Sequence, residues 1–324
     1  MSKITFQGAK IQSFSDSPKP VTPPLILDTL AQLESEPQNR LLKRARSKYV
    51  TGAIAIGLAD LKTALEKYYR NAYYCNHTLV QQGDTVTGKY CNTRICNICN
   101  RIRTAKLING YSGALQKMEN PKFVTLTRTN VTAALLPVTL DEMCNTFRAI
   151  LKINSLHKQR YGKSVTHNGI RKIEITYNVT ANTFHPHFHI VTDGASAEVL
   201  RSEWLERNAG VTDIQGQNIR PVDKNTLVEL FKYSTKIVTQ GKQSMPFEAI
   251  DVIMRSLYRR RVVQPYGAIR RVSEDVDELR SDSYPELPEY ELMQWVWEHQ
   301  DWVNLYGECL TGYSPDVEKC NGTQ

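Results

Sequence analysis

Three of the seven histidines in this chain fall within five residues: His185, His187 and His189. Side chains at alternate positions of a β-strand share one face, so this spacing predicts a strand with all three imidazoles on one side. Phe188 and Ile190 would lie on the opposite side, against a core. Neutral imidazole binds divalent metals strongly, so we interpret the strand as a metal platform. The alternative is a polar strand face that carries histidines without a metal.

A second strand is predicted directly upstream. Residues 171–179 alternate charged or polar side chains with apolar ones, and residues 178–183 are rich in turn formers. An antiparallel hairpin of the two strands would bring Glu174 to the histidine face. Two imidazoles and one carboxylate leave coordination positions open, which suits Mg²⁺ or Mn²⁺ acting as a Lewis acid on a phosphate oxygen. A solvated position for Glu174 stays open, because the sequence alone does not fix the hairpin register.

A third motif lies on a helix predicted over residues 224–239. No Pro or Gly interrupts this run, and Asp223 or Asn225 can cap its start. Glu229, Tyr233 and Lys236 are spaced so that they share one helical face. A tyrosine hydroxyl becomes a competent nucleophile beside a cation and a metal-polarised phosphodiester. Taken alone, such a face is typical of a solvated helix surface, so its interpretation depends on the histidine strand.

The order of these motifs resembles the HUH-endonuclease superfamily, and most of all the rolling-circle replication initiators (Rep proteins) of small bacterial plasmids. A Phe-x-Thr-Leu-Thr strand over residues 123–127 comes first, followed by His-Pro-His-Phe-His and then by Glu-x-x-x-Tyr-x-x-Lys. The resemblance covers residues 75–240, roughly. The histidine run is a fairly specific signal for this family. The tyrosine helix is a specific signal only when it occurs together with the histidine run.

The resemblance implies a role for each motif. His187 and His189 would be the metal-binding pair, and Tyr233 would attack the DNA backbone. Glu229 would activate water at termination, and His185 is the additional histidine of the plasmid subgroup. The implied fold is α+β: a central antiparallel sheet with an RRM/ferredoxin-like core carries the histidines, and helices flank it.

The seven cysteines are an odd number, which favours metal ligands or free thiols over a disulfide framework. The spacing of four of them fits a tetrahedral structural Zn²⁺ site formed by Cys75, Cys91, Cys96 and Cys99. His77 is close enough in sequence to replace one of these ligands. A set of buried free thiols is the alternative. Related plasmid Rep proteins look similar here, with one Cys followed by a Cys-x4-Cys-x2-Cys run.

Charge is strongly polarised along the chain. Residues 1–273 carry a net charge of +19, whereas residues 274–324 carry −11. A basic body of this size suits binding to a phosphate backbone, although any one cluster is more often a solvated face. The predicted DNA contacts are Arg101, Arg103, Lys106, Arg259, Arg260 and Arg261.

We expect five regions. Residues 1–38 are rich in Ser, Pro and Gln and predict a mobile arm. Residues 39–119 predict a helical, Cys-rich region that binds DNA and contains the zinc segment, which spans about residues 73–107. Residues 120–242 would form the nicking domain, and residues 243–273 a basic extension that is predicted to be helical. Residues 274–324 would be an acidic tail whose aromatic residues either pack back or meet a partner.

Within the nicking domain, the hydrophobic pattern predicts a set of regular elements. Strands are expected near residues 122–128, 171–179 and 184–192, and helices near residues 139–159, 196–207 and 224–239.

The sequence therefore predicts a metal-dependent enzyme that nicks and joins plasmid origin DNA, single-stranded or in a hairpin, through a 5′-phosphotyrosine intermediate. A host helicase and polymerase are the expected further partners. The chain lacks a long apolar run and a signal-peptide core, so we expect a cytoplasmic protein without a membrane partner. The alternatives are an HUH relaxase, a single-strand transposase, or a zinc-containing DNA-binding protein without enzymatic activity.

Overall fold

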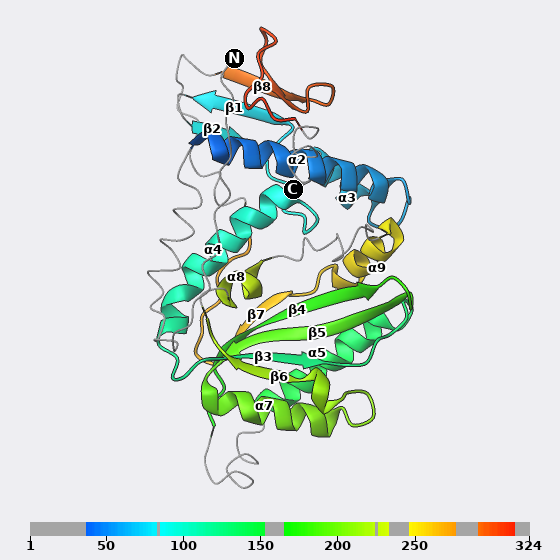
Figure 1. Cartoon of the computed structure of the whole chain (residues 1–324), viewed down its shortest axis with the longest axis vertical. Coiled ribbons are helices and arrows are strands. Elements are labelled where there is room, and N and C mark those ends of the chain that lie inside the picture. The colour runs from blue at the N-terminus through cyan, green and yellow to red at the C-terminus, as the bar shows by residue number, and fades with distance from the viewer. Residues whose placement is uncertain are drawn as a thin grey trace, which may run out of the picture.

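The computed structural model describes residues 37–82, 85–152, 165–223, 226–232, 246–276 and 291–314. Two antiparallel sheets, with helices between and beside them, make up this part of the chain (Figure 1). We refer to the five-stranded sheet as the large sheet and to the four-stranded sheet as the small sheet. The predicted α+β class, with an antiparallel sheet flanked by helices, is confirmed.

The large sheet contains the strands that the sequence predicted. Its members are β3 (Lys122–Thr127), β4 (Gly169–Asn178), β5 (Thr183–Thr192), β6 (Asn218–Pro221) and β7 (Val263–Tyr266). Their order is β6-β3-β5-β4-β7, so the histidine strand β5 lies at the centre. The predicted bounds of β3, β4 and β5 agree with these within two residues.

A short turn between β4 and β5 fixes the hairpin. The side-chain oxygen of Asn178 accepts a hydrogen bond from the amide of Ala181 at 3.0 Å. Asn182 adopts a φ of 50°, a left-handed conformation that asparagine tolerates better than most residues. The side-chain oxygen of Asn182 also accepts from the Tyr177 hydroxyl at 2.8 Å. These hydrogen bonds and this backbone conformation explain why asparagine occupies positions 178 and 182 of the turn.

One face of the large sheet is covered by α5 (Leu136–Lys152) and α7 (Gly194–Arg207), which lie side by side in Figure 1. Phe188 of β5 packs there against Phe147 and Trp204, with ring centroids 5.7 and 5.5 Å apart. Side chains alternate along a strand, so the histidines of β5 project to the opposite face. Against that face lies α8 (Thr226–Phe231), which in turn contacts α4 (Asn97–Gln116).

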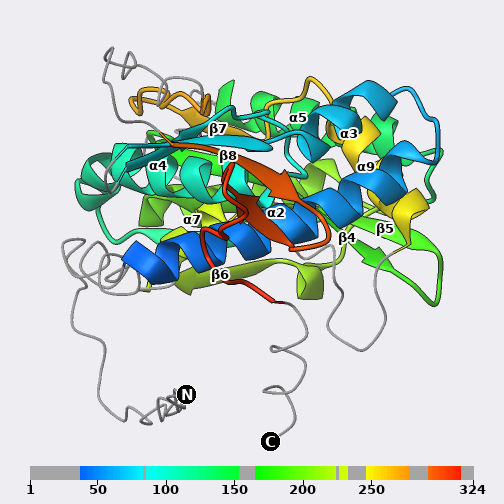
Figure 2. The same ribbon diagram turned by 90° about the horizontal axis from the view of Figure 1, so that it is seen from above.

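The N-terminal and C-terminal parts of the described chain form the small sheet together. It consists of β1 (Thr78–Gln82), β2 (Thr85–Gly88), β8 (Glu291–Val296) and β9 (Asp301–Val303), in the order β2-β1-β8-β9. It packs on α2 (Pro37–Ala59), which is followed by α3 (Glu66–Tyr73). Figure 2 shows β8 and the segment after it lying over α2. The described part of the acidic tail is therefore folded into the N-terminal region.

Aromatic side chains attach this tail. Trp302 is fully buried and its indole N–H donates to the main-chain carbonyl of Asn76 at 2.7 Å. Trp295 packs against it edge to face, at 4.8 Å between ring centroids. Gly52 of α2 leaves room for Trp297, since a Cβ at Gly52 would lie 2.1 Å from that indole ring. Of the two outcomes predicted for the aromatic residues, packing back is observed for the three tryptophans, whereas Tyr306 is exposed.

Two predicted elements differ from the structure. The basic extension is helical only in α9 (Phe247–Leu257), and β7 then forms the edge of the large sheet instead of a continued helix. Arg259 ends the helical run by adopting a φ of 57°, and the β-branched Val262 and Val263 favour the strand that follows. The predicted helix over 224–239 is seen as α8, and its residues 233–239 lie outside the described part of the chain.

Among the described residues, no helix combines the length and the apolar composition needed to cross a membrane.

We predict that Trp302→Ala lowers the free energy of unfolding by about 3–5 kcal/mol, the usual cost of truncating a buried tryptophan. Urea unfolding followed by tryptophan fluorescence and circular dichroism measures this. Tyr306→Ala is the matched control, because Tyr306 is 87% exposed in the same segment. Equal stability of the two variants would contradict the packing role of the tail.

Candidate functional site

The hairpin register brings Glu174 opposite the middle histidine. Glu174 pairs with His187 across β4 and β5, and Lys172 pairs with His189. Directly opposed residues of antiparallel strands project to the same face. One ligand atom from each of Glu174, His187 and His189 lies within 4.8 Å of the others. These three residues form a group that can hold a metal ion.

His187 presents a defined nitrogen to this group. Its Nδ1 lies 3.2 Å from the carbonyl oxygen of His185. A carbonyl only accepts, so Nδ1 carries the proton and the lone pair remains on Nε2. Burial lowers the pKa of His187, which is only 8% exposed, and keeps the ring neutral at neutral pH. The neutral imidazole is the form that binds metals.

His189 and Glu174 are in direct contact, with Nε2 and Oε2 3.6 Å apart. Burial lowers the pKa of His189 to about 4, and His187 adds to this effect. Burial raises the pKa of Glu174, but the positive charge and the hydrogen bond of Lys172 act in the opposite direction, and the net shift is downward. At neutral pH the group is one carboxylate with two neutral imidazoles, a donor set that fits a divalent ion with open positions.

Lys172 is a buried cation beside the group, with only 2% of its side chain exposed. Its ammonium donates to Glu174 Oε2 at 2.9 Å and to the main-chain carbonyl of Lys232 at 2.7 Å. Lys232 immediately precedes Tyr233 in the sequence. Lys172 therefore ties the carboxylate of the metal group to the segment that leads into the predicted nucleophile.

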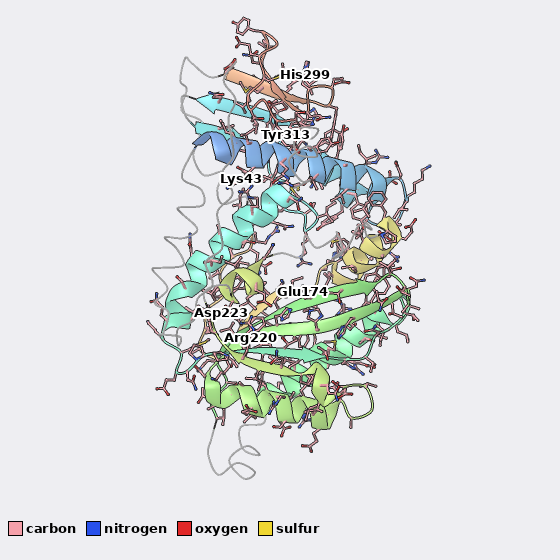
Figure 3. All side chains as sticks on the ribbon, in the orientation of Figure 1. Lys43, Glu174, Arg220, Asp223, His299 and Tyr313 are labelled. Atoms are coloured by element: carbon pink, nitrogen blue, oxygen red, sulfur yellow. The ribbon has the colours of Figure 1, made fainter. Side chains whose placement is uncertain are left out.

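A chain of contacts joins Glu229 of α8 to the same site. Arg220 of β6 donates from Nη2 to Glu229 Oε2 at 2.6 Å. The Arg220 guanidinium lies 4.3 Å from the ring centroid of Phe123, and this ring stacks on His189 at 5.1 Å. Figure 3 shows Arg220 and Glu174 on the side of the large sheet that faces α8. A cation and a carboxylate are thus held at the edge of the metal group.

Three predicted site residues stand apart from this geometry. Tyr233 and Lys236 lie outside the described residues. His185 neighbours His187, with ring centroids 5.4 Å apart, but pairs with Thr176 and does not join the three-residue metal group. Besides this ring contact, its main-chain carbonyl lies 3.2 Å from the Nδ1 of His187.

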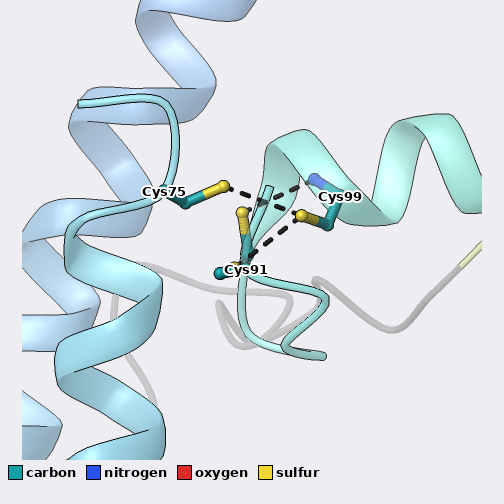
Figure 4. Close-up of side chains that lie close together, drawn as sticks. Cys75, Cys91 and Cys99 are labelled. Atoms are coloured by element: carbon teal, nitrogen blue, oxygen red, sulfur yellow. Dashed lines mark hydrogen bonds between the residues drawn. The ribbon is translucent and has the colours of Figure 1, made fainter. Parts of the chain in front are cut away.

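The four predicted zinc ligands come together at the start of α4. Figure 4 shows three of them, Cys75, Cys91 and Cys99. The Cys99 Sγ lies 3.7 Å from that of Cys75 and 3.7 Å from that of Cys91, and the fully buried Cys96 completes the group. All four sulfur atoms lie within 4.8 Å of one another. Tetrahedral Zn²⁺ with bonds of about 2.3 Å places its sulfurs about 3.8 Å apart, so the four thiols fit this ion.

The surroundings of the thiols also fit a metal. Lys48 is fully buried, and its ammonium donates to the main-chain carbonyl of Tyr73 at 2.5 Å. Burial lowers the pKa of Lys48 to about 8, although negative charge on Cys75 and Cys96 acts in the opposite direction. A cation at this position balances the negative charge that four thiolates carry. His77, the proposed substitute ligand, is not a member of the group.

The predicted DNA contacts divide into two sets. Arg101, Arg259 and Arg261 are exposed. Lys106 donates to the main-chain carbonyl of Asp275 at 2.9 Å, and Arg260 is paired with the Asp141 carboxylate. The side chains of Lys106 and Arg260 are therefore already bonded to other groups of the protein.

Arg103 requires a correction, because it is 4% exposed. Its guanidinium donates to the carbonyls of Glu274 and Asn92, at 3.0 and 2.9 Å. These bonds join α4 to the loop of the zinc segment and to the start of the tail. In this structure Arg103 is a buried structural residue instead of the exposed DNA contact that its sequence position predicted.

The sequence analysis did not single out Lys172 or Arg220. Lys172 lies two residues before Glu174, so strand periodicity alone would have placed the two on one face. Arg220 lies on β6, a short strand of four residues without a clear alternating pattern. Its place in the site depends on the pairing of Arg220 with Phe123 in β3.

Protein purified without chelators should contain about one Zn²⁺ per chain, and Cys96→Ser should lose it together with part of the folding stability. Elemental analysis and urea unfolding measure the two effects. Cys309→Ser is the control, since Cys309 is exposed and outside the four-thiol group. Wild-type protein without zinc would refute the assignment.

Comparison with known proteins agrees with these motifs. Residues 83–193 match a family described as Replication protein. A "Protein rep" of Staphylococcus aureus is 32% identical over 165 residues, which cover 45% of this chain and 69% of that protein. A "Protein rep" of Streptococcus pneumoniae is 24% identical over 206 residues, which cover 56% of this chain and 62% of that protein. No solved structure matches the chain. The chain therefore belongs to the Rep family of plasmid replication proteins.

Proposed function

We propose that this Rep protein initiates rolling-circle replication by nicking and rejoining single-stranded origin DNA through Tyr233. The observation that carries the proposal is the position of Lys172. Its ammonium contacts both the Glu174 carboxylate and the carbonyl of Lys232, at 2.9 and 2.7 Å. The residue next to Tyr233 is thereby held beside the group suited to a metal ion. Phosphoryl transfer requires the nucleophile to be held against the phosphate that the metal binds, and Lys232 directly precedes Tyr233 in the sequence.

The chemistry requires one bond to form as another breaks. The Tyr233 oxygen attacks the scissile phosphorus, the bond from phosphorus to the 3′ oxygen breaks, and the phenolic proton is released. The DNA 5′ end stays on the tyrosine, and the 3′ oxygen leaves as a hydroxyl that a host polymerase can extend. Lys236, on the same predicted helical face as Tyr233, supplies a nearby positive charge.

Glu174, His187 and His189 would hold the divalent ion, Mg²⁺ or Mn²⁺. When bound, such an ion polarises the scissile phosphate as a Lewis acid. The chain's own contribution is to keep the two imidazoles neutral by burial and the carboxylate ionised beside Lys172. A host helicase would expose the single-stranded origin on which this site acts.

Glu229 is proposed to act at termination. A tyrosine already linked to DNA cannot attack a second time, so release needs another nucleophile, and a carboxylate can activate water as a general base. Glu229 is half-exposed, and Arg220 holds it at the edge of the metal group. A DNA phosphate that competes for Arg220 would free this carboxylate for the incoming water.

Tyr233→Phe should abolish the covalent protein–DNA adduct, because only the attacking oxygen is removed. An origin oligonucleotide with Mn²⁺, resolved on a denaturing gel, measures the adduct, and anisotropy should show nearly unchanged binding. Tyr177→Phe is the control, since Tyr177 lies near the end of the β4–β5 hairpin. Adduct that persists in Tyr233→Phe would move the nucleophile elsewhere.

Loss of an outer-shell partner of a metal ligand usually reduces activity about 10–100-fold. Because His187 belongs to the metal group itself, His187→Ala should reduce cleavage by more than this. EDTA should stop wild-type cleavage and Mn²⁺ should restore it. His185→Ala is the matched control on the same strand and should keep most of the activity, because His185 lies outside the metal group. Cleavage that is insensitive to EDTA would contradict the metal-dependent mechanism.

Glu229→Ala should nick DNA normally but fail to end replication, so multimeric single strands should accumulate in cells carrying the plasmid. Gel analysis of plasmid forms measures the ratio of multimers to monomer circles. Glu198→Ala removes an exposed carboxylate from α7 and serves as the control. Normal monomer circles from Glu229→Ala would mean that Glu229 has only a surface role.

A further inference from the structure

A pocket of about 500 Å³ lies between the zinc segment, α4 and the turn that follows α9. Six arginines line it: Arg94, Arg103, Arg259, Arg260, Arg261 and Arg271. Two tyrosines, Tyr68 and Tyr258, also line it, and their rings meet edge to face at 6.0 Å. The carboxylate residues on its wall are Glu274 and Asp275, so positive charge predominates. An anionic ligand with an aromatic part suits these walls.

Some of these arginines build the pocket. Arg94 donates to the main-chain carbonyls of Leu257 and Arg260, both at 2.6 Å. This joins the loop between two zinc ligands, Cys91 and Cys96, to the end of α9. Arg103 and Arg260 are likewise engaged in bonds to protein groups, as described above. Three of the six guanidinium groups are therefore fixed parts of the wall.

The other three arginines are available to a ligand. Arg259, Arg261 and Arg271 are exposed, and their guanidinium groups have no hydrogen bond or ion pair with any group in the described ranges. Arg259 lies over the ring of Tyr258, at 5.4 Å from its centroid. The left-handed φ of 57° at Arg259 costs conformational energy, which is typical of residues held in place at functional sites.

The pocket adjoins the metal group along β4. Val263 of β7 pairs with Lys172, and the carbonyl of Val262 then accepts from the amide of Ile173 at 2.9 Å. The residue just before β7 therefore still runs beside β4, and Arg261 immediately precedes it in the sequence. Because Lys172 and Glu174 both belong to β4, this segment links the pocket residue Arg261 to the strand that provides the carboxylate of the metal group.

We propose that this pocket binds the single-stranded DNA next to the scissile phosphate. Its phosphates would contact Arg259, Arg261 and Arg271, and one base would lie against Tyr258, which is 45% exposed. The position of this site next to the scissile phosphate rests on the proposed nicking function, whereas the proposal itself concerns only DNA binding. It adds Tyr258 and Arg271 to the DNA contacts and assigns Arg94 to the positioning of the pocket wall.

Single-stranded DNA fits better than duplex for two reasons. A pocket of about 500 Å³ has the size of a small-ligand site, which suits one nucleotide. An exposed tyrosine ring and an arginine plane are the surfaces on which unpaired bases stack, and duplex DNA does not offer an unstacked base. Because the loop after Cys91 forms part of the wall, loss of zinc should also weaken binding at this pocket.

The test uses full-length protein with Tyr233→Phe, so that covalent reaction does not affect the measurement. Anisotropy with a short fluorescein-labelled oligothymidylate gives the affinity over a range of salt concentrations. Arg259→Gln with Arg271→Gln should weaken binding and reduce the salt slope by about 1.4, since each single-strand phosphate contact contributes about 0.7. Arg148→Gln with Arg201→Gln removes the same charge from α5 and α7, and should leave both quantities nearly unchanged.

Tyr258 gives a second and independent readout. Tyr258→Ala should weaken oligothymidylate binding about fivefold or more, the usual effect of losing a stacking ring, whereas Tyr258→Phe should retain it. Thermal melts establish that the variants fold. Unchanged affinity in Tyr258→Ala and in the double arginine variant would overturn the proposal, and so would a larger loss for duplex than for single strand. Failure of nicking by Tyr233 would leave these binding results unaffected, so the two proposals fail separately.

Discussion

The pairing of β4 with β5 sets both faces of the large sheet at once. Ten residue pairs hold the two strands in one register. On one face this register directs Phe188 into the apolar layer beneath α5 and α7; on the other it sets Glu174 against His187. A slip by one residue would exchange the two faces, burying the metal group in the core and exposing the core to solvent. The hydrophobic core therefore enforces the geometry of the site.

The same pairing forces two neighbouring cations into the interior. Arg171 and Lys172 are each 2% exposed, but they point to opposite faces. Arg171 donates to Gln264 at 2.9 Å and lies over the ring of Phe188. Lys172 has Glu174 and a main-chain carbonyl as its partners. Buried charges are tolerated only when paired in this way, and removal of one partner is strongly destabilising. The cation beside the metal group is thus also part of the buried structure of the hairpin.

The zinc segment connects the two sheets. Cys75 follows α3 and Cys99 lies in the first turn of α4, so a metal held by the four thiols fixes the angle between these helices. From this segment Arg94 reaches the end of α9, and the chain beyond α9 forms β7 beside β4, the strand that contains Glu174. The four-thiol group is therefore linked through a few contacts to the edge of the candidate active site. The small sheet, completed by the acidic tail, covers the other side of α2.

The sequence by itself determined the features that depend on local spacing. Alternation placed the three histidines on one face, the bounds of β3, β4 and β5 were predicted within two residues, and the cysteine spacing identified all four thiols of the zinc candidate. Only the tertiary structure decided which groups from distant segments meet. It places Glu174, and not His185, with His187 and His189, and it brings Arg220 to Glu229 and β8 to β1. It also buries Arg103. Local periodicity is encoded residue by residue, whereas strand register and the partner of a long side chain follow from packing of the whole chain.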